Sequence, residues 1–474
     1  MELIEHIPVE VIQLLTSSEA VEYRLLPYEK VEMDIRCYGS VGRDYTGVVE
    51  ELAVLYGWRV SVVPISDEEL QHLLTKYYRT DAGGGVPVTG RLTDISSGQG
   101  FLMSLVGEAF RDYASDIHLE PYENRCRIRF RIDGKLTERY VIERTQYTPL
   151  VNQIKILANL DISEKRLPQD GRILYNRDCN KFDVRVSSLP TIYGEKIVLR
   201  LLTRHVELLE LRNLGFSERQ YEDYCRAIRR PFGMVLICGP TGSGKSTTLY
   251  ATLRRLNATT ENILTIEDPI EYTLEGVNQV QLKEEIGLTF ANTLRTFLRQ
   301  DPDIIMLGEI RDVDTAQMAV RSSLTGHLLF STIHTNTAWG AVARLSDMGV
   351  HPYLVANTLV MCVAQRLVRL LCPHCKRRVK AAEDVGRLLS GAEIRDYYEA
   401  VGCEKCFYTG YSGRRAVYEV IPMDEGLSAA ARNSQSEIDD LLRERGITSL
   451  KDAVIDLFRR GETSLDELIP LLNY

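Results

Sequence analysis

Several classes of protein are excluded by what the sequence has little of. Lys and Arg (57) are outnumbered by Asp and Glu (66), and the net charge of −9 argues against a protein that coats nucleic acid with positive charge. No run of about 20 mostly apolar residues, as a membrane span needs, is present. The first residues, MELIEHIPVEV, lack a basic leader, so no secretory signal is expected. We therefore expect a cytoplasmic protein that reaches a membrane only through a partner.

What the sequence does contain is the composition of a folded protein. Apolar residues make up 44% and charged residues 26%, and a chain of 474 residues suggests about three domains. Ten cysteines in a cytoplasmic chain indicate thiols or metal ligands more than disulfides. Four of them form two Cys-x-x-Cys pairs. The others are expected to be buried apolar fillers: Cys37, Cys126, Cys179, Cys225, Cys238 and Cys362.

The clearest joint in the chain is rich in glycine and serine. Residues 81–97, with Gly83-Gly84-Gly85 and Pro87, cannot bury much apolar surface and predict a flexible linker. Residues 1–80 then form a small module of helix and strand. It closes with SDEELQHLLTKYY, which predicts a helix with Ser66 as its N-cap and Glu69 three residues on.

The next module, residues 98–205, carries a stripe of arginines. Between Arg125 and Ile132 arginines alternate with apolar residues, which predicts a strand with one buried and one basic face. Asp133-Gly134 predicts a hairpin turn after it, and a helix and further strands make the module α+β. The basic face is either a solvated sheet surface or a surface that meets phosphate or an acidic neighbouring subunit.

From about residue 206, short apolar runs alternate with longer helical stretches. The runs MVLIC, ILTIE, IIMLG and LLFST predict a largely parallel sheet that is covered on both faces. The first run leads into a glycine-rich loop and then a helix, which is the context that a phosphate-binding loop requires. The predicted loop residues are Gly239, Pro240, Thr241, Gly242, Ser243, Gly244, Lys245, Ser246 and Thr247.

The residue types of this loop predict a nucleoside triphosphate site. Glycines let successive backbone N–H groups point at the phosphates, and the following helix N-terminus adds partial positive charge. Lys245 is expected to reach the β- and γ-phosphates, and the Ser246 hydroxyl is expected to hold Mg²⁺.

Acidic and histidine side chains at later strand ends are candidates for hydrolysis. Glu309 follows the run IIML and is placed to polarise an attacking water. Glu267, Asp268 and Glu271 in TIEDPIEY would repel one another unless a divalent ion or an arginine lies among them. Their alternative role is to form a turn around Pro269. His327 and His334, which bracket the run LLFST, either make structural hydrogen bonds or sense the γ-phosphate.

The two cysteine pairs predict a structural zinc site. Cys372, Cys375, Cys403 and Cys406 can complete a tetrahedral four-thiolate shell, which leaves no open position for catalysis. Zinc binding contributes about 10 kcal/mol in small modules, enough to hold a loop-rich subdomain. His374 is a spare candidate ligand. A zinc ribbon that reads nucleic acid is the alternative, which the net acidity disfavours although Lys376-Arg377-Arg378 supplies local positive charge.

Taken in order, these motifs resemble the assembly ATPases of type II secretion systems and type IV pili. The resemblance rests on GPTGSGKST, TIEDPIEY, GEIRD, TGHLLFSTIHTN and the cysteine pairs. It extends upstream through SDIHLEP (115–121), RIRFRIDGKL (127–136), EKRLPQDGRI (164–173) and DVRVSSLPTIYGEKIVLRLL (183–202).

The resemblance implies a fold and a division into domains. It implies an α/β fold with a RecA-like P-loop NTPase core over 206–474, which includes C-terminal helices and a zinc subdomain at about 370–410. Before the core it implies a PAS-like α+β domain over 98–205. Residues 1–80 would form a small α+β domain that docks on an adaptor.

The resemblance also implies an activity and roles for residues. It implies a hexameric ring at the inner membrane that hydrolyses ATP with Mg²⁺ and, with Zn²⁺ in its tetracysteine site, adds pilin-like subunits. Its partners would be a membrane platform protein, the cytoplasmic domain of a membrane adaptor and acidic phospholipid. Glu309 would be the catalytic glutamate, and Arg185 and Arg200 would reach the nucleotide's phosphates unless they form strand salt bridges. Arg172 is a weaker candidate.

The cysteine pairs favour an assembly motor over a retraction motor, because retraction motors of similar sequence lack them. Two rival functions remain at this point. The first is a ring that translocates DNA, and the second is a nucleotide-gated scaffold without hydrolysis, which Lys245, Ser246 and Glu309 disfavour.

Overall fold

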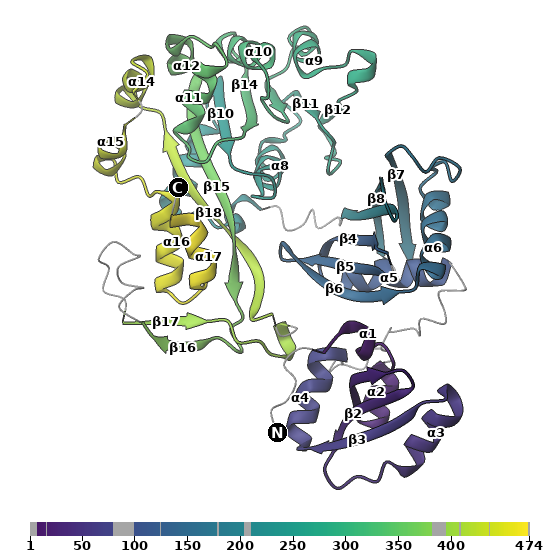
Figure 1. Cartoon of the computed structure of the whole chain (residues 1–474). Helices are drawn as coiled ribbons and strands as arrows, with labels where there is room; N and C mark the ends of the chain where they lie inside the picture. The colour runs from purple at the N-terminus through teal and green to yellow at the C-terminus, as the bar shows by residue number, and fades with distance from the viewer. Residues whose placement is uncertain are drawn as a thin grey trace. The chain divides into compact units, whose positions relative to one another are not determined.

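The computed structural model divides into two compact units, residues 1–204 with 401–410 and residues 205–400 with 411–474 (Figure 1). The structure describes residues 7–15, 17–78, 99–123, 125–177, 180–202, 210–381, 395–406, 409–435 and 437–472. The predicted linker, residues 81–97, and Cys179 lie outside these ranges. The division into domains at 1–80, 98–205 and 206–474 stays a prediction.

The N-terminal part of the first unit is a three-stranded sheet with four helices. The strand order is β1-β2-β3, with β1 antiparallel and β3 parallel to β2. The predicted cap of the last helix is confirmed, because the Glu69 N–H donates to Ser66 Oγ (3.3 Å) and the Ser66 N–H donates to Glu69 Oε2 (3.2 Å). The elements are α1 (Val9–Ile12), α2 (Ser17–Tyr23), β1 (Leu25–Val31), β2 (Asp34–Ser40), α3 (Thr46–Tyr56), β3 (Arg59–Ile65) and α4 (Asp67–Tyr78).

The rest of the first unit is built on a six-stranded antiparallel sheet. Its order is β6-β5-β4-β9-β8-β7, and the apolar residues of its inner face pack against the two helices α5 and α6. The predicted hairpin is confirmed, with Asp133 and Gly134 both at positive φ (47° and 83°). The elements are α5 (Gln99–Arg111), β4 (Ala114–Pro121), β5 (Cys126–Ile132), β6 (Lys135–Ile142), α6 (Arg144–Leu157), β7 (Gln169–Arg177), β8 (Asn180–Thr191) and β9 (Gly194–Leu202).

The arginine stripe on the outer face of this sheet pairs with acids of the neighbouring strand. Arg129 donates to both oxygens of Glu120 (2.7 and 2.8 Å), and Arg127 donates to the same carboxylate (2.9 Å). Arg131 lies 3.5 Å from Asp116. The three side chains are 22–35% exposed, so the stripe is a partly solvated face whose arginines are paired within the sheet, and contact with phosphate or another subunit stays a prediction. The alternation within one strand could not show that its neighbour carries the matching carboxylates.

Glu120 is the centre of this charge network and predicts a dependence of stability on pH. Its burial raises the pKa, but hydrogen bonds from Arg129, Lys196 and Arg127 outweigh burial and lower the pKa to about 2. A carboxyl group with a lowered pKa stabilises the fold above its unfolded pKa of about 4.5, and this contribution is lost as the pH falls toward 2. The contribution at neutral pH is at most about 3 kcal/mol.

We expect Glu120→Gln to lower the local free energy of unfolding of this sheet by about 1–3 kcal/mol at pH 7, because it leaves partly buried cations without a counter-charge. The variant should also lose less stability than the wild type between pH 4.5 and 2.5. Native-state hydrogen exchange of the β4 and β5 amides in the full chain measures both effects. Glu138→Gln is the matched control, because Glu138 lies 3.9 Å from Arg127 and is more exposed. Equal effects of the two variants would contradict the role of Glu120.

The second unit is organised around a seven-stranded sheet in the order β12-β11-β13-β14-β10-β15-β18. Six strands run parallel, as the apolar runs predicted, and β18 is antiparallel to β15. These two long strands run side by side toward a small β16–β17 hairpin (Figure 1). The strands are β10 (Gly233–Cys238), β11 (Ile263–Glu267), β12 (Asn278–Gln281), β13 (Ile304–Leu307), β14 (Leu328–Ile333), β15 (Leu359–Leu371), β16 (Arg377–Lys380), β17 (Asp396–Glu399) and β18 (Tyr411–Pro422).

Helices cover both faces of this sheet. Residues of β10 alternate between two cores, with Met234 and Leu236 in one and Val235 and Ile237 in the other. Helices α7 and α8 pack on the second core, and the later α-helices pack on the first. The helices are η3 (Leu211–Leu214), α7 (Glu218–Ala227), α8 (Lys245–Leu256), η4 (Glu284–Ile286), α9 (Phe290–Phe297), α10 (Val313–Leu324), α11 (Gly340–Asp347), α12 (Pro352–Thr358), η5 (Glu404–Cys406), α14 (Glu425–Arg432), α15 (Asp439–Glu444), α16 (Leu450–Arg459) and α17 (Leu465–Leu472).

Two expectations from composition can be checked on the described residues. Within those ranges no helix has the length and hydrophobicity that crossing a bilayer requires. The scattered cysteines that the structure describes are buried thiols, as expected for apolar fillers: Cys37, Cys126, Cys225, Cys238 and Cys362.

Candidate active site and metal centre

The glycine-rich loop leaves β10 at the carboxyl edge of the sheet and ends where α8 begins, at Lys245. Gly239 (φ 151°) and Gly244 (φ 87°) hold backbone conformations that other residues rarely adopt. A Cβ at Gly239 would also lie 2.6 Å from both Gln365 O and Ser243 Oγ. The loop is therefore a tight cradle that only glycine permits at these points.

The polar groups of the loop fit a triphosphate. Lys245 is 8% exposed and donates to the carbonyl oxygens of Gly239 (2.8 Å) and Pro240 (3.0 Å). Burial lowers the pKa of Lys245, and the negative charge of Glu309 partly opposes this. Ser243 Oγ is buried and has no hydrogen-bond partner among the described residues. A cation held in the cradle and a buried polar atom that lacks a partner are both suited to bind phosphate oxygens.

Glu309 lies beyond the end of β13 and is contacted by an arginine and a histidine. Its carboxylate is 2.5 Å from Arg311 Nη2 and 3.4 Å from His334 Nε2. Arg311 also lies 3.6 Å from Asp268, so an arginine does stand among the acids, as the repulsion argument required. The hydrogen bond with Glu309 raises the pKa of Arg311. Sequence analysis missed Arg311, although it stands in GEIRD two residues after the glutamate.

Glu267, at the end of β11, faces the interior of the fold. It is 4% exposed and accepts hydrogen bonds from Thr265 Oγ1 (2.7 Å), Gln279 Nε2 (2.9 Å) and the Tyr250 hydroxyl. The same hydroxyl receives a hydrogen bond from the backbone N–H of Glu271 (3.1 Å). These contacts fix the strand end and the turn after it. The participation of Glu267 and Glu271 in hydrolysis stays a prediction.

The two histidines lie at opposite ends of β14. His334 follows the strand and reaches Glu309, whereas His327 precedes it and bonds through Nδ1 to Ser322 O (3.0 Å). Because β14 runs parallel to β10, a strand of 6 residues at about 3.3 Å each places His327 about 20 Å from the phosphate loop of the same chain. Only His334 is thus available to the site within one chain. A role for His327 at the nucleotide stays a prediction.

Two buried charged residues that sequence analysis missed hold the loop after His334. Arg366 on β15 is 4% exposed and donates to Asn336 O (2.9 Å), and Glu419 on β18 is 6% exposed and accepts from the Ala338 N–H (2.8 Å). Burial raises the pKa of Glu419. Ionisable side chains are rarely buried this deeply unless they have hydrogen-bond or ion-pair partners. Their signal in the sequence was a charge inside an apolar strand.

The two candidate arginines lie on the six-stranded sheet of the other unit. Arg185 on β8 and Arg200 on β9 are directly opposite each other in the ladder. The side chain of Arg200 is 58% exposed and bonds through Nε to Asp116 (3.0 Å). Arg172, the weaker candidate, is tied to Asp183 through both Nε and Nη2. Their contact with a nucleotide stays a prediction.

The four predicted cysteines form one cluster. The sulfur atoms of Cys372, Cys375, Cys403 and Cys406 all lie within 4.8 Å of one another, and those of the last two are 3.8 Å apart. Tetrahedral zinc with bonds of about 2.3 Å requires sulfur separations of about 3.8 Å, so the donor set fits Zn²⁺. The Gly410 N–H also donates to Cys406 Sγ (3.3 Å). Among the described residues His374 is not part of the cluster.

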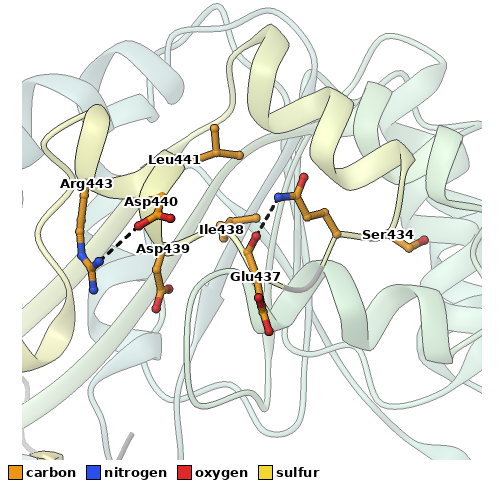
Figure 2. A pocket seen from close by; sticks show the side chains of 8 residues that line it. Ser434, Glu437, Ile438, Asp439, Asp440, Leu441 and Arg443 are labelled. Carbon is orange, nitrogen blue, oxygen red and sulfur yellow. Dashed lines mark hydrogen bonds and ion pairs between the residues drawn. The ribbon is translucent and has the colours of Figure 1, made fainter.

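A polar hollow of about 870 Å³ lies on the surface beside α15 (Figure 2). Glu437, Asp439 and Asp440 line it, and Arg443 forms an ion pair with Asp440 (3.3 Å). Three carboxylates would repel a triphosphate. This hollow is therefore not the candidate nucleotide site.

Comparison with known proteins settles the family. The family model described as Type II/IV secretion system protein matches residues 92–470. The chain belongs to this family. The Type II secretion system ATPase E of Vibrio cholerae is 46% identical over 369 residues, which cover 77% of this chain and 73% of that protein. The Type IV pilus assembly ATPase PilB of Thermus thermophilus is 43% identical over 407 residues, covering 85% of this chain and 46% of PilB.

A solved structure confirms the fold of this family member. The crystal structure of the pilus retraction motor PilT with bound ADP matches 78% of this chain and 96% of its own, with a TM-score of 0.56 and 24% identity. The expected α/β fold and the resemblance to secretion and pilus ATPases are both confirmed.

Proposed function

We propose that this chain is the ATPase that drives assembly of pseudopilin filaments in a type II secretion system. It is an ATPase of the secretion and pilus-assembly family, as its family and its relatives indicate. The observation that carries the proposal is the meeting of the phosphate loop, Lys245 and Glu309 at one edge of the sheet. A phosphate cradle beside a carboxylate is what hydrolysis of a phosphoanhydride requires.

Each residue of the site has a part in this mechanism. The loop amides and Lys245 bind the phosphates of ATP, and Ser246 is placed on the first turn of α8 to hold Mg²⁺, which neutralises phosphate charge when bound. Glu309 orients and polarises the attacking water, and its ion pair with Arg311 fixes the position of its carboxylate. His334, 3.4 Å from Glu309, keeps that carboxylate aligned.

The finer parts of the proposal concern assembly and location. We propose a hexamer on the cytoplasmic face of the inner membrane, held there by a platform protein, the cytoplasmic domain of an adaptor and acidic phospholipid. In this ring the sheet that carries Arg185 and Arg200 closes over bound ATP. The tetracysteine cluster, which fits a structural zinc, supports an assembly motor over a retraction motor.

The second candidate is the extension motor of a type IV pilus. The 43% identity to PilB, which spans 85% of this chain, favours it. The 46% identity to the secretion ATPase supports secretion, which we keep as the first candidate. A DNA-translocating ring receives less support, because the arginine stripe on β5 is bonded to acids of its own sheet.

The experiment that tests the proposal is phosphate release from ATP by the purified chain in the presence of different effectors. Vesicles of acidic phospholipid that carry the platform protein's cytoplasmic domain should raise the rate, and duplex DNA should not. Stimulation by DNA alone, with a steep dependence on salt, would contradict the proposal and support translocation. Deletion of the gene should abolish protein secretion, whereas loss of pili instead would select the second candidate.

A further inference from the structure

The surroundings of Arg200 single out one carboxylate. Asp116 on β4 is the direct partner of Arg200 across the ladder, and its Oδ1 accepts a hydrogen bond from Arg200 Nε (3.0 Å). The Asp116 side chain is 9% exposed, whereas that of Arg200 is 58% exposed. A buried carboxylate therefore holds the Nε end of an exposed guanidinium group.

The mode of this contact differs from that of other arginines on the same sheet. Arg129 uses Nε and Nη2 together on Glu120, and Arg172 uses the same two nitrogens on Asp183. Arg200 uses Nε alone, and in the described part of the chain no hydrogen bond involves its terminal nitrogens. The two Nη groups therefore form an open fork, the geometry that binds phosphate oxygens in pairs.

The second carboxylate oxygen of Asp116, Oδ2, has contacts of its own. The Ser115 hydroxyl donates to Oδ2 (2.8 Å), and Arg131 Nε lies 3.5 Å from the same atom. These contacts leave Oδ1 for Arg200 and restrict how the carboxylate can turn. The position of Asp116 thus sets the direction in which Arg200 points.

The charge balance of this row explains why a carboxylate is needed. Arg185 and Arg200 are directly opposite each other on β8 and β9, and like charges in that arrangement destabilise a sheet. Asp116, on the other side of Arg200, supplies the compensating charge.

We propose that Asp116 is a positioning residue that holds Arg200 with its terminal nitrogens outward, ready to meet the phosphates of ATP. The inference rests on the proposed function, because it needs Arg200 to act in hydrolysis. By fixing Nε, Asp116 removes rotations that Arg200 would otherwise lose as the transition state forms. Its loss should therefore lower the rate of hydrolysis beyond any effect on the stability of the sheet.

The test compares variants of both residues in the full chain. Asp116→Asn and Asp116→Ala should each lower kcat for ATP about 10-fold or more, with KM changed less than about 2-fold, because misplacement of a catalytic group costs rate. Arg200→Ala should lower kcat at least as much. Combining Asp116→Asn with Arg200→Ala should add nothing further, because Asp116 acts through Arg200. Asp116→Asn keeps the shape of the side chain but removes its charge, so thermal unfolding is measured in parallel to separate a loss of stability of the sheet from the loss of kcat.

Asp183→Asn is the matched control, since Asp183 binds an arginine of the same sheet in the other mode and should leave kcat near the wild-type value. If Arg200→Ala keeps full activity, the arginine role in the proposed function fails, whatever Asp116 does. If Arg200→Ala loses activity while both Asp116 variants keep it, the inference alone is overturned. A loss of kcat that is equally large with and without Arg200 would assign Asp116 a merely structural role and overturn it as well.

Discussion

Replacing Glu309 by Gln should lower kcat for ATP hydrolysis about 10²- to 10⁴-fold, the range for removal of a general base. The substituted amide keeps the size of the side chain but lacks the charge that polarises water. Binding of ATP should persist or tighten, because Lys245 and the loop are unchanged and a negative charge near the triphosphate is removed. Steady-state phosphate release gives kcat, and equilibrium titration with ATP gives the dissociation constant.

The matched control for this variant is Glu285→Gln, which removes an exposed carboxylate from η4 in the same unit. It should hydrolyse ATP at the wild-type rate. A Glu309→Gln protein that turns over as fast as the wild type would refute the assignment of Glu309. One that no longer binds ATP would show instead that Glu309 holds the loop together.

Removal of the zinc ligands has the second large expected effect. Cys406→Ser, or chelation of the wild-type protein, should remove one zinc per chain and destabilise the subdomain strongly, since zinc contributes about 10 kcal/mol in small modules. The consequences should reach the C-terminal helices, because Lys376 Nζ donates to Gly461 O (2.6 Å) and the Leu371 N–H donates to Glu462 O (2.8 Å). Metal analysis and limited proteolysis measure the loss of zinc and the new cleavage sites.

Cleavage should begin in residues 371–410 and near Gly461, while the phosphate loop stays protected and still binds ATP. Cys225→Ser is the control, because this buried thiol is outside the cluster and should leave the zinc content unchanged. If the protein without zinc resists protease as well as the wild type does, zinc has no structural role. Simultaneous collapse of the phosphate loop would show that the zinc supports the whole unit.

The features that could be predicted from the sequence are those set by neighbouring residues. The phosphate loop could be predicted because a strand, a glycine-rich segment, Lys245 and a helix follow one another directly in the sequence. The helix cap at Ser66 and the turn at Asp133-Gly134 are equally local. The spacing of the cysteines sufficed to propose the zinc ligands, because two Cys-x-x-Cys pairs supply the four thiolates that a structural zinc site needs.

The features that were missed depend on how strands pair and on what lies beside them. Glu120 and Arg129 become partners only when β4 pairs with β5, and Arg366 meets Asn336 only when β15 lies beside the loop after β14. The long β15–β18 pair also escaped notice, because β15 is buried nearly throughout and shows little alternation. His327 was grouped with His334 as one motif, although they bracket a predicted strand and a strand carries its two ends to opposite edges of a sheet.

The measurement that tests the central claim most directly is the fate of ATP on the purified wild-type chain with Mg²⁺, followed by separation of the nucleotides. The account predicts that ADP and phosphate accumulate over many turnovers, and that a Lys245→Ala protein prepared in parallel forms neither. Recovery of intact ATP from a wild-type protein that demonstrably binds it, even when the membrane partners are supplied, would contradict the account.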